Sequence, residues 1–169
     1  MTEAEFNNSL VKSYGGIEIT LLKEKTLESP RKRYRYCLHD NTNHLTQEMI
    51  ICMNGFSYFR PHKHPKGNSE SYHMLDGQLD IFIFDDKGKV LQIVKLSSKE
   101  SNINNDRDLI YRLSGSKYHL MIPQSEWVIF HEVSTGPFDT SKIQEADFAP
   151  LNNCSLIEAE NYCKSLYKF

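Results

Sequence analysis

The chain has 169 residues, of which 39% are hydrophobic and 25% charged, a composition typical of one globular domain with an adequate core. Its 20 basic and 22 acidic residues leave a formal charge of −2, whereas a general nucleic-acid-binding protein usually carries a basic excess. No apolar run approaches the roughly 20 residues of a membrane helix, and Met1–Ser13 lacks the basic-then-apolar order of a secretory signal. The four cysteines are scattered, with no CxxC pair. We therefore expect a reduced cytoplasmic protein with no nucleic-acid or membrane partner.

The first 30 residues are expected to form an irregular leader with one short apolar run, Ile17–Leu22. From Arg33 onward, short runs rich in Tyr, Ile, Phe and Val are separated by Gly, Pro, Asn and Asp, a texture typical of strands and turns. Strands are expected near residues 33–38, 47–53, 56–60, 70–76, 78–85, 89–96, 109–113, 118–122 and 126–133. Many short strands at this spacing favour a β-sandwich or barrel over alternating strands and helices.

Two local signals specify particular elements. The run Gln78–Asp85 pairs with Lys89–Leu96 in a hairpin, because Gly88 allows the turn between them to adopt a positive φ. Near the end of the chain, Ser155–Glu158 has the form of a capping box, in which a hydroxyl and a carboxylate satisfy free amides of the first helical turn. Apolar residues then recur at helical spacing. We therefore predict a C-terminal amphipathic helix that packs on the β-core.

A cluster of potential metal ligands lies in the middle of the chain. His62 and His64 are two residues apart, so on an extended strand both imidazoles project from the same face. Glu70 follows across a loop that contains Pro65 and Gly67. Two imidazoles and a carboxylate can close around one divalent ion at about 2.0–2.2 Å per ligand. The alternative is that both histidines are surface residues on a polar loop.

The alternation of side chains between the two faces of a strand predicts which further side chains lie around this cluster. Tyr72 shares the inward face with Glu70, whereas His73 faces outward. If the preceding strand is regular, Arg60 points into the same cavity as the histidines, beside Tyr58. A guanidinium near a metal is suited to bidentate capture of phosphate or carboxylate, so Arg60, Tyr58 and Tyr72 are candidate ligand-binding residues. The alternative for Arg60 is a salt bridge at the rim of the barrel.

These residues carry a resemblance to a known family. The pattern Gly55–x6–His62–x–His64–x5–Glu70–x6–Gly77 resembles the first motif of the cupin superfamily. Five segments narrow the resemblance to WbuC-type cupin-fold metalloproteins, found in bacterial O-antigen gene clusters: residues 29–33, 58–65, 84–88, 136–139 and 148–150. The resemblance implies a mainly β fold, a cupin double-stranded β-helix or jelly-roll barrel. An N-terminal extension (1–28) would precede the cupin domain (29–150), and a C-terminal α-helix (151–169) would pack on the barrel.

The family also supplies a fourth ligand, a histidine on a later strand that usually follows Pro-Pro-Gly-Thr-Trp. Counting back without gaps from residues 136–139 places His119 at that position, although both prolines are missing. Pro123 and Trp127 imitate the motif one strand later, which makes His131 a rival. We favour His119, because only that alignment leaves enough chain for a returning strand before residue 136.

Three alternating arginines, Arg31, Arg33 and Arg35, fall on one face of the first predicted strand. A solvated strand face is the default interpretation of such a run. The resemblance to the family's arginine-rich segment at this place favours one of them lining the mouth of a ligand site. We take Arg33 as that candidate.

The resemblance implies a set of activities and ligands. Three imidazoles and a carboxylate would hold one divalent transition metal, Fe, Mn, Ni, Co or Zn, and ligand type alone does not choose among these ions. The protein would bind or convert an anionic sugar or sugar nucleotide in surface-polysaccharide (O-antigen) biosynthesis, for example as an isomerase or epimerase, and it would be a homodimer. A non-catalytic sugar-binding or regulatory cupin and an iron-dependent dioxygenase are the alternatives, because cupins host many unrelated activities.

Overall fold

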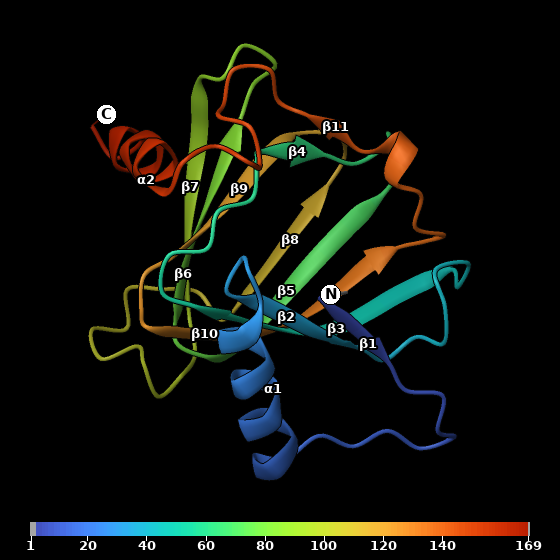
Figure 1. Cartoon of the computed structure of the whole chain (residues 1–169). Helices are drawn as coiled ribbons and strands as arrows, with labels where there is room; N and C mark the ends of the chain where they lie inside the picture. Colours follow the sequence, from blue (N-terminus) through green and yellow to red (C-terminus); the bar gives the residue numbers. More distant parts are fainter. Residues whose placement is uncertain (1–2, 169) are drawn as a thin grey trace.

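The computed structural model describes residues 3–168, which form two β-sheets and two α-helices (Figure 1). The strands are β1 (Ala4–Phe6), β2 (Arg33–Cys37), β3 (Thr46–Asn54), β4 (His62–Lys63), β5 (Ser69–Asp76), β6 (Gln78–Phe84), β7 (Val90–Ser97), β8 (Ile110–Ser114), β9 (Tyr118–Pro123), β10 (Trp127–Thr135) and β11 (Gln144–Glu145). The helices are α1 (Gly16–Glu28) and α2 (Leu156–Ser165), and Thr140–Lys142 forms a 3-10 turn.

The two sheets face each other as a jelly roll. One has the strand order β1-β2-β3-β10-β5-β8, and the other has the order β11-β4-β9-β6-β7. The parallel pair β1–β2 lies at one edge of the first sheet, and the other pairs are antiparallel. Every second residue of a strand points to the same face, so each sheet contributes alternate apolar residues to the space between them. The buried core comes chiefly from Met49, Ile51, Met53, Tyr72, Leu79, Ile81, Ile83, Met121, Val128 and Phe130.

Each helix covers the outer face of one sheet. Helix α1 buries Leu22 against the outward side chains of β2 and β3, including Tyr36 and Ile50. Helix α2 packs on the five-stranded sheet, where Cys163 lies in one apolar cluster with Phe82 of β6. Within residues 3–168, no helix is long and apolar enough to cross a membrane.

Most of the elements expected from the short apolar runs and the turn residues between them are confirmed. Eight of the nine expected strands are present within a few residues of their expected bounds. The hairpin β6–β7 turns through Gly88 at φ +85°, and Asp85 accepts hydrogen bonds from the backbone amides of Lys87 and Lys89. Helix α2 begins where the capping box predicts, with the Ser155 hydroxyl accepting from the amide of Glu158 at 3.2 Å. Among the described residues, the reciprocal bond from the Ser155 amide to the Glu158 carboxylate is not made.

The expectation of an irregular leader is wrong. Residues 4–6 add a strand to the six-stranded sheet, and residues 16–28 form a helix that contains the apolar run. That helix has a narrow buried stripe, because Leu22 and Thr26 are buried while Ile17 and Leu21 are exposed. A helix with so few buried positions has little apolar periodicity, which is why the sequence pattern did not indicate it.

The expected strand at residues 56–60 is also absent. The chain leaves β3 through Gly55 at φ +54° and continues as an extended loop up to Pro61, which has no amide hydrogen to donate to a ladder. Loop contacts replace sheet pairing, since the Ser57 hydroxyl donates to the carbonyl of Arg31 and the Tyr58 hydroxyl donates to that of Pro150, both at 2.8 Å. The alternation of side chains along a strand therefore cannot predict in which direction the side chains of residues 56–60 point.

Candidate metal centre

Three histidines from two neighbouring strands meet at one end of the jelly roll. His62 on β4 and His119 on β9 are direct cross-strand partners in the five-stranded sheet, and His64 follows β4 immediately. Glu70 reaches the same place from β5 of the opposite sheet. His119 and Glu70 are buried, and His62 is 9% exposed. The cluster therefore lies between the two sheets rather than on a polar surface loop.

The three imidazoles converge closely enough to hold one ion. One ring nitrogen from each of His62, His64 and His119 lies within 4.8 Å of the others. Ring centroids are 4.4 Å apart for His62 and His119, and 5.3 Å apart for each remaining pair. A metal with nitrogen ligands at about 2.0–2.1 Å needs only small side-chain movements to be bound by all three. This cluster could therefore hold a metal ion.

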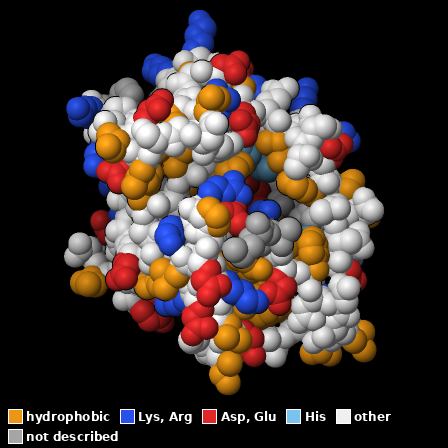
Figure 2. Space-filling model, viewed as in Figure 1, with side chains coloured by type: hydrophobic (Ala, Val, Ile, Leu, Met, Phe, Trp, Pro, Cys, Tyr) orange, Lys and Arg blue, Asp and Glu red, His pale blue; other side chains and the backbone are white. Residues whose placement is uncertain are grey.

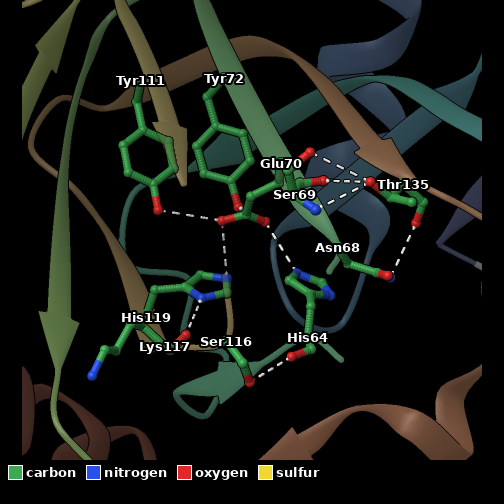
Figure 3. A network of polar contacts seen from close by, with 10 residues as sticks. All are labelled: His64, Asn68, Ser69, Glu70, Tyr72, Tyr111, Ser116, Lys117, His119 and Thr135. Carbon is green, nitrogen blue, oxygen red and sulfur yellow. Dashed lines mark hydrogen bonds and ion pairs between the residues drawn. The ribbon is translucent and has the colours of Figure 1, made fainter. Parts of the chain in front are cut away.

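Glu70 lies at the centre of a polar network beside the imidazoles (Figure 3). Its Oε2 is 3.1 Å from His64 Nε2 and accepts a hydrogen bond from the Tyr72 hydroxyl at 2.9 Å. Its Oε1 is 3.1 Å from His119 Nε2 and accepts from the Tyr111 hydroxyl at 3.4 Å. The two tyrosines thus fix the carboxylate in an orientation that presents it to two of the three histidines.

Two ring nitrogens of the cluster are buried without a hydrogen-bond partner among the described residues, His62 Nδ1 and His119 Nε2. The 3.1 Å approach of Glu70 to His119 Nε2 is at ion-pair distance but is not aligned as a hydrogen bond. His119 Nδ1 lies 3.1 Å from the carbonyl of Lys117, which can only accept. That contact favours a proton on Nδ1 and a free lone pair on Nε2, the form that binds a metal. The donor set therefore fits a transition metal.

The electrostatics of the metal-free cluster follow from burial and close approach. Burial lowers the pKa of His62 well below its usual value. Burial would also lower the pKa of His119, but the Glu70 carboxylate outweighs that effect and raises it. Burial opposes ionisation of Glu70, yet His119 and then His64 hold its pKa well below the usual range. Without a metal, Glu70 and His119 therefore form a buried ion pair.

Metal affinity is expected to fall as the pH is lowered through the pKa of His119. This pKa is raised above its ordinary value of about 6.5, so at lower pH a metal must displace a proton from the His119 imidazolium, which is paired with Glu70. His62 is already neutral and adds no such cost. Calorimetric titration with Zn(II) between about pH 6 and 8, in buffers of different ionisation enthalpy, would measure the affinity and the protons released. An affinity that does not change with pH would contradict this picture.

A cavity of about 700 Å³ opens from the cluster to the surface. Figure 2 shows it as a hollow with histidine atoms inside and basic side chains nearby. Its walls include His62, His64, Glu70 and Tyr72, so Tyr72 lies where strand parity placed it. All three alternating arginines also line it: Arg31, Arg33 and Arg35. The default interpretation of a solvated strand face is therefore corrected, and more than one arginine reaches the ligand mouth.

Arg60 and Tyr58 are not part of this cavity, which corrects their assignment as ligand-binding residues. The Arg60 guanidinium donates to the carbonyl of Ala149 at 3.2 Å and lies 3.5 Å from a carboxylate oxygen of Glu145. Tyr58 packs against Tyr162 of α2. Both side chains turn away because the irregular segment 56–60 breaks the parity on which the assignment depended. Arg60 instead makes the rim salt bridge that was its alternative.

His131 lies far from the cluster, on the outer face of the six-stranded sheet. Its ring is 5.6 Å from that of His73, its cross-strand partner on β5, and its Nε2 is 3.9 Å from Glu48 Oε1. Of the two rivals, only His119 is brought beside His62 and His64. Which histidine binds a metal stays a prediction until metal content is measured.

Sequence reasoning missed three residues of the site. Tyr111 on β8 supports Glu70, Phe59 lies edge-on to His62 with a centroid distance of 4.9 Å, and Glu132 on β10 lines the cavity. A signal for Glu132 was present, because it continues the inward face of Val128 and Phe130 by strict alternation. Phe59 and Tyr111 carried no comparable signal.

Comparisons with known proteins agree with the fold. Residues 18–96, less than half of the chain, match a family described as a domain of unknown function (DUF6016). No curated protein matches the sequence. A solved structure from Shewanella oneidensis is similar with a TM-score of 0.51 at 8% identity, covering 64% of this chain and 66% of that one. The chain thus spans just under two thirds of the length of that protein.

Two further solved structures are similar, and the name of the first includes its architecture. An uncharacterized conserved protein with a double-stranded beta-helix domain from Klebsiella pneumoniae has a TM-score of 0.50 at 12% identity, covering 70% of this chain and 88% of that one. A Cupin_2 domain of an XRE-family transcriptional regulator from Enterobacter cloacae has a TM-score of 0.46 at 20% identity, covering 63% and 98%. At these identities the likeness concerns the fold alone. The chain has the double-stranded β-helix fold of the cupins, with a histidine cluster that could hold a metal ion.

Proposed function

We propose that this protein is a mononuclear-metal cupin of the WbuC type that binds or converts a sugar or sugar nucleotide in bacterial surface-polysaccharide biosynthesis. The observation that carries the proposal is the position of the histidine cluster at the inner end of the cavity. His62, His64 and Glu70 line that cavity, so a bound ion would face it with coordination positions left for ligand oxygens. Such an ion polarises a carbonyl or hydroxyl oxygen of the ligand.

The chain itself supplies a group that could move a proton. Glu132 lines the cavity on β10, and its cross-strand partner is Tyr72. Burial, and then the neighbouring Glu70 carboxylate, raise the pKa of Glu132 to about 7. A carboxyl group with this pKa can both accept and release a proton near neutral pH, as isomerisation or epimerisation of a sugar requires. We assign that role to Glu132 within the proposed function.

The first test is metal content. Protein purified without a metal-affinity tag is expected to contain one divalent transition metal per chain at partial or full occupancy, measured by elemental analysis. Incubation with Fe(II), Mn(II), Ni(II) or Zn(II) should complete the occupancy. Protein that stays metal-free after all four incubations would end the proposal.

The second test is ligand binding and turnover by the metal-loaded protein. A panel of nucleotide sugars is expected to include one that raises the melting temperature, because a ligand that binds only the folded state stabilises it by mass action. Exchange of a sugar C–H proton in deuterated water would then identify isomerase or epimerase chemistry. A shift without exchange would indicate a non-catalytic binding protein, and oxygen uptake would indicate a dioxygenase.

A further inference from the structure

Each charged side chain that lines the cavity is paired with an oppositely charged side chain, inside the cavity or beside it, or with the imidazoles, with three exceptions. The pairs are Arg31 with Glu3, Lys142 with Asp139, Glu145 with Arg60, and Glu70 with His64 and His119. The exceptions are Arg33, Arg35 and Glu132. Among residues 3–168, the side chains of these three make no hydrogen bond and no ion pair within 4.0 Å, although all three are only half-exposed.

The two unpaired arginines point the same way and lie close together. They are alternate residues of β2, so they share the face that lines the cavity and their Cα atoms are about 7 Å apart. Two guanidinium groups that are partly removed from water without a partner anion repel each other. Accordingly, burial, and then the positive charges of Arg35 and Arg31, lower the pKa of Arg33 to about 10. Both groups nevertheless stay charged at neutral pH.

Glu132 does not neutralise this pair. It lies on β10, across β3 from β2, and its position on that strand is opposite Cys37 rather than opposite either arginine. Even a fully ionised Glu132 offers one negative charge against two positive ones. Glu3 and Glu132 oppose the charge of Arg33 from a distance, but Glu3 is paired with Arg31, and neither carboxylate lies within 4.0 Å of the Arg33 or Arg35 guanidinium. Among the described residues, no carboxylate therefore pairs directly with either arginine.

We propose that Arg33 and Arg35 form an anion subsite that binds the phosphate group of the cavity's ligand. Guanidinium groups donate paired N–H bonds in a planar fork, and two such forks match the several oxygens and the double charge of a phosphate ester better than the two oxygens of a carboxylate. Nothing else in the cavity offers unpaired donors of this kind among the described residues.

The position of the subsite also limits the size of the ligand, a step that rests on the proposed function. The Phe59 ring adjoins both sites: the Arg33 guanidinium lies 4.8 Å from its centroid, and the centroid of the His62 ring lies 4.9 Å from it. The arginines and the histidine cluster are therefore close enough for one small ligand to reach both. A sugar phosphate or the proximal part of a nucleotide sugar can therefore place its phosphate on the arginines and its hydroxyl or carbonyl oxygens at the histidine cluster.

The test uses the full chain in its metal-free form and inorganic phosphate as the probe. Calorimetric titration at constant ionic strength is expected to show phosphate and pyrophosphate binding, with acetate much weaker. Arg33→Met and Arg35→Met should each weaken phosphate binding by at least about tenfold, the loss expected for a charge-assisted contact. Arg33→Lys keeps the charge but loses the fork, and it should fall between the wild type and Arg33→Met.

Arg60→Met is the matched control, because Arg60 is a half-buried arginine close in sequence whose guanidinium lies outside the cavity. It should bind phosphate as the wild type does, and melting curves would show that each variant is folded. Absence of phosphate binding by the wild type would overturn the subsite. Phosphate binding by Arg33→Met and Arg35→Met that is as tight as that of the wild type would also overturn it. Acetate binding as tightly as phosphate would overturn its assignment to phosphate.

The result can be separated from the fate of the proposed function, because no metal is needed in this titration. Phosphate binding by a protein that takes up no metal would support the subsite while ending the metal-dependent function. Metal uptake without phosphate binding would leave the metal-dependent function standing and overturn the subsite.

Discussion

His119→Ala is expected to lose most of its bound metal, whereas His131→Ala is expected to retain it. The His119 imidazole is fully buried between His62 and His64, and its Nε2 has no hydrogen-bond partner among the described residues. Loss of a partner that merely orients a ligand costs about 10–100-fold in metal affinity. Loss of a ligand itself should therefore exceed about a hundredfold. Elemental analysis and competition with a chromophoric chelator would measure the difference.

His131→Ala provides the matched control for this substitution. His131 is half-buried on the outer face of the six-stranded sheet beside His73, away from the histidine cluster. Its removal should weaken side-chain packing on the outer face of the sheet and leave the metal affinity within error of that of the wild type. Metal retained by His119→Ala and lost by His131→Ala would reverse the assignment. Far-ultraviolet circular dichroism of both variants would exclude unfolding as the cause of any loss.

Short apolar runs bounded by turn residues were sufficient to predict most of the fold. In β6 and β9 these runs are nearly continuous, because α2 covers the outer face of their sheet and both faces of the strands are buried. Helix α2 was equally predictable from the sequence, because Ser155 and Glu158 mark its first turn. Helix α1 was not predictable in this way, since its buried stripe is narrow. Its N-cap and first residue are the glycines Gly15 and Gly16, which have no side chain that could cap the helix.

In the candidate site, too, residues close together in sequence were predictable from their spacing, whereas the residue on a later strand needed further information. His62, His64 and Glu70 are close in sequence, so their spacing alone predicted that they belong to one site, although Glu70 reaches that site from the opposite sheet. His119 needed the alignment of a later strand, which came from the resemblance and agrees with its cross-strand pairing to His62. Arg60 was misplaced because Gly55 and Pro61 bound a segment with no regular strand. Parity predicts side-chain direction only where the strand that carries it is continuous.

Gly77→Ala is expected to destabilise the protein by about 2–5 kcal/mol. Gly77 forms the tight connection between β5 and β6 at φ +76°, a backbone conformation that costs a residue with a side chain about 1–2 kcal/mol. A Cβ at this position would lie 1.9 Å from the carbonyl oxygen of Trp127 and 2.5 Å from the Ser125 hydroxyl oxygen. Because Trp127 is held by backbone pairing to β3, the overlap must be relieved by movement of the turn, at about 1–3 kcal/mol more.

Gly55→Ala is the control that separates these two contributions. Gly55 also has a positive φ, +54°, but a Cβ there would have no atom within 4 Å. It should therefore cost only the backbone part, about 1–2 kcal/mol. Urea unfolding of the metal-free variants would give both free energies of unfolding. Equal destabilisation by the two substitutions would show that the close approach of Trp127 to the turn does not constrain it. A larger loss for Gly77→Ala would instead show that the close approach of the Trp127 carbonyl constrains the turn between β5 and β6.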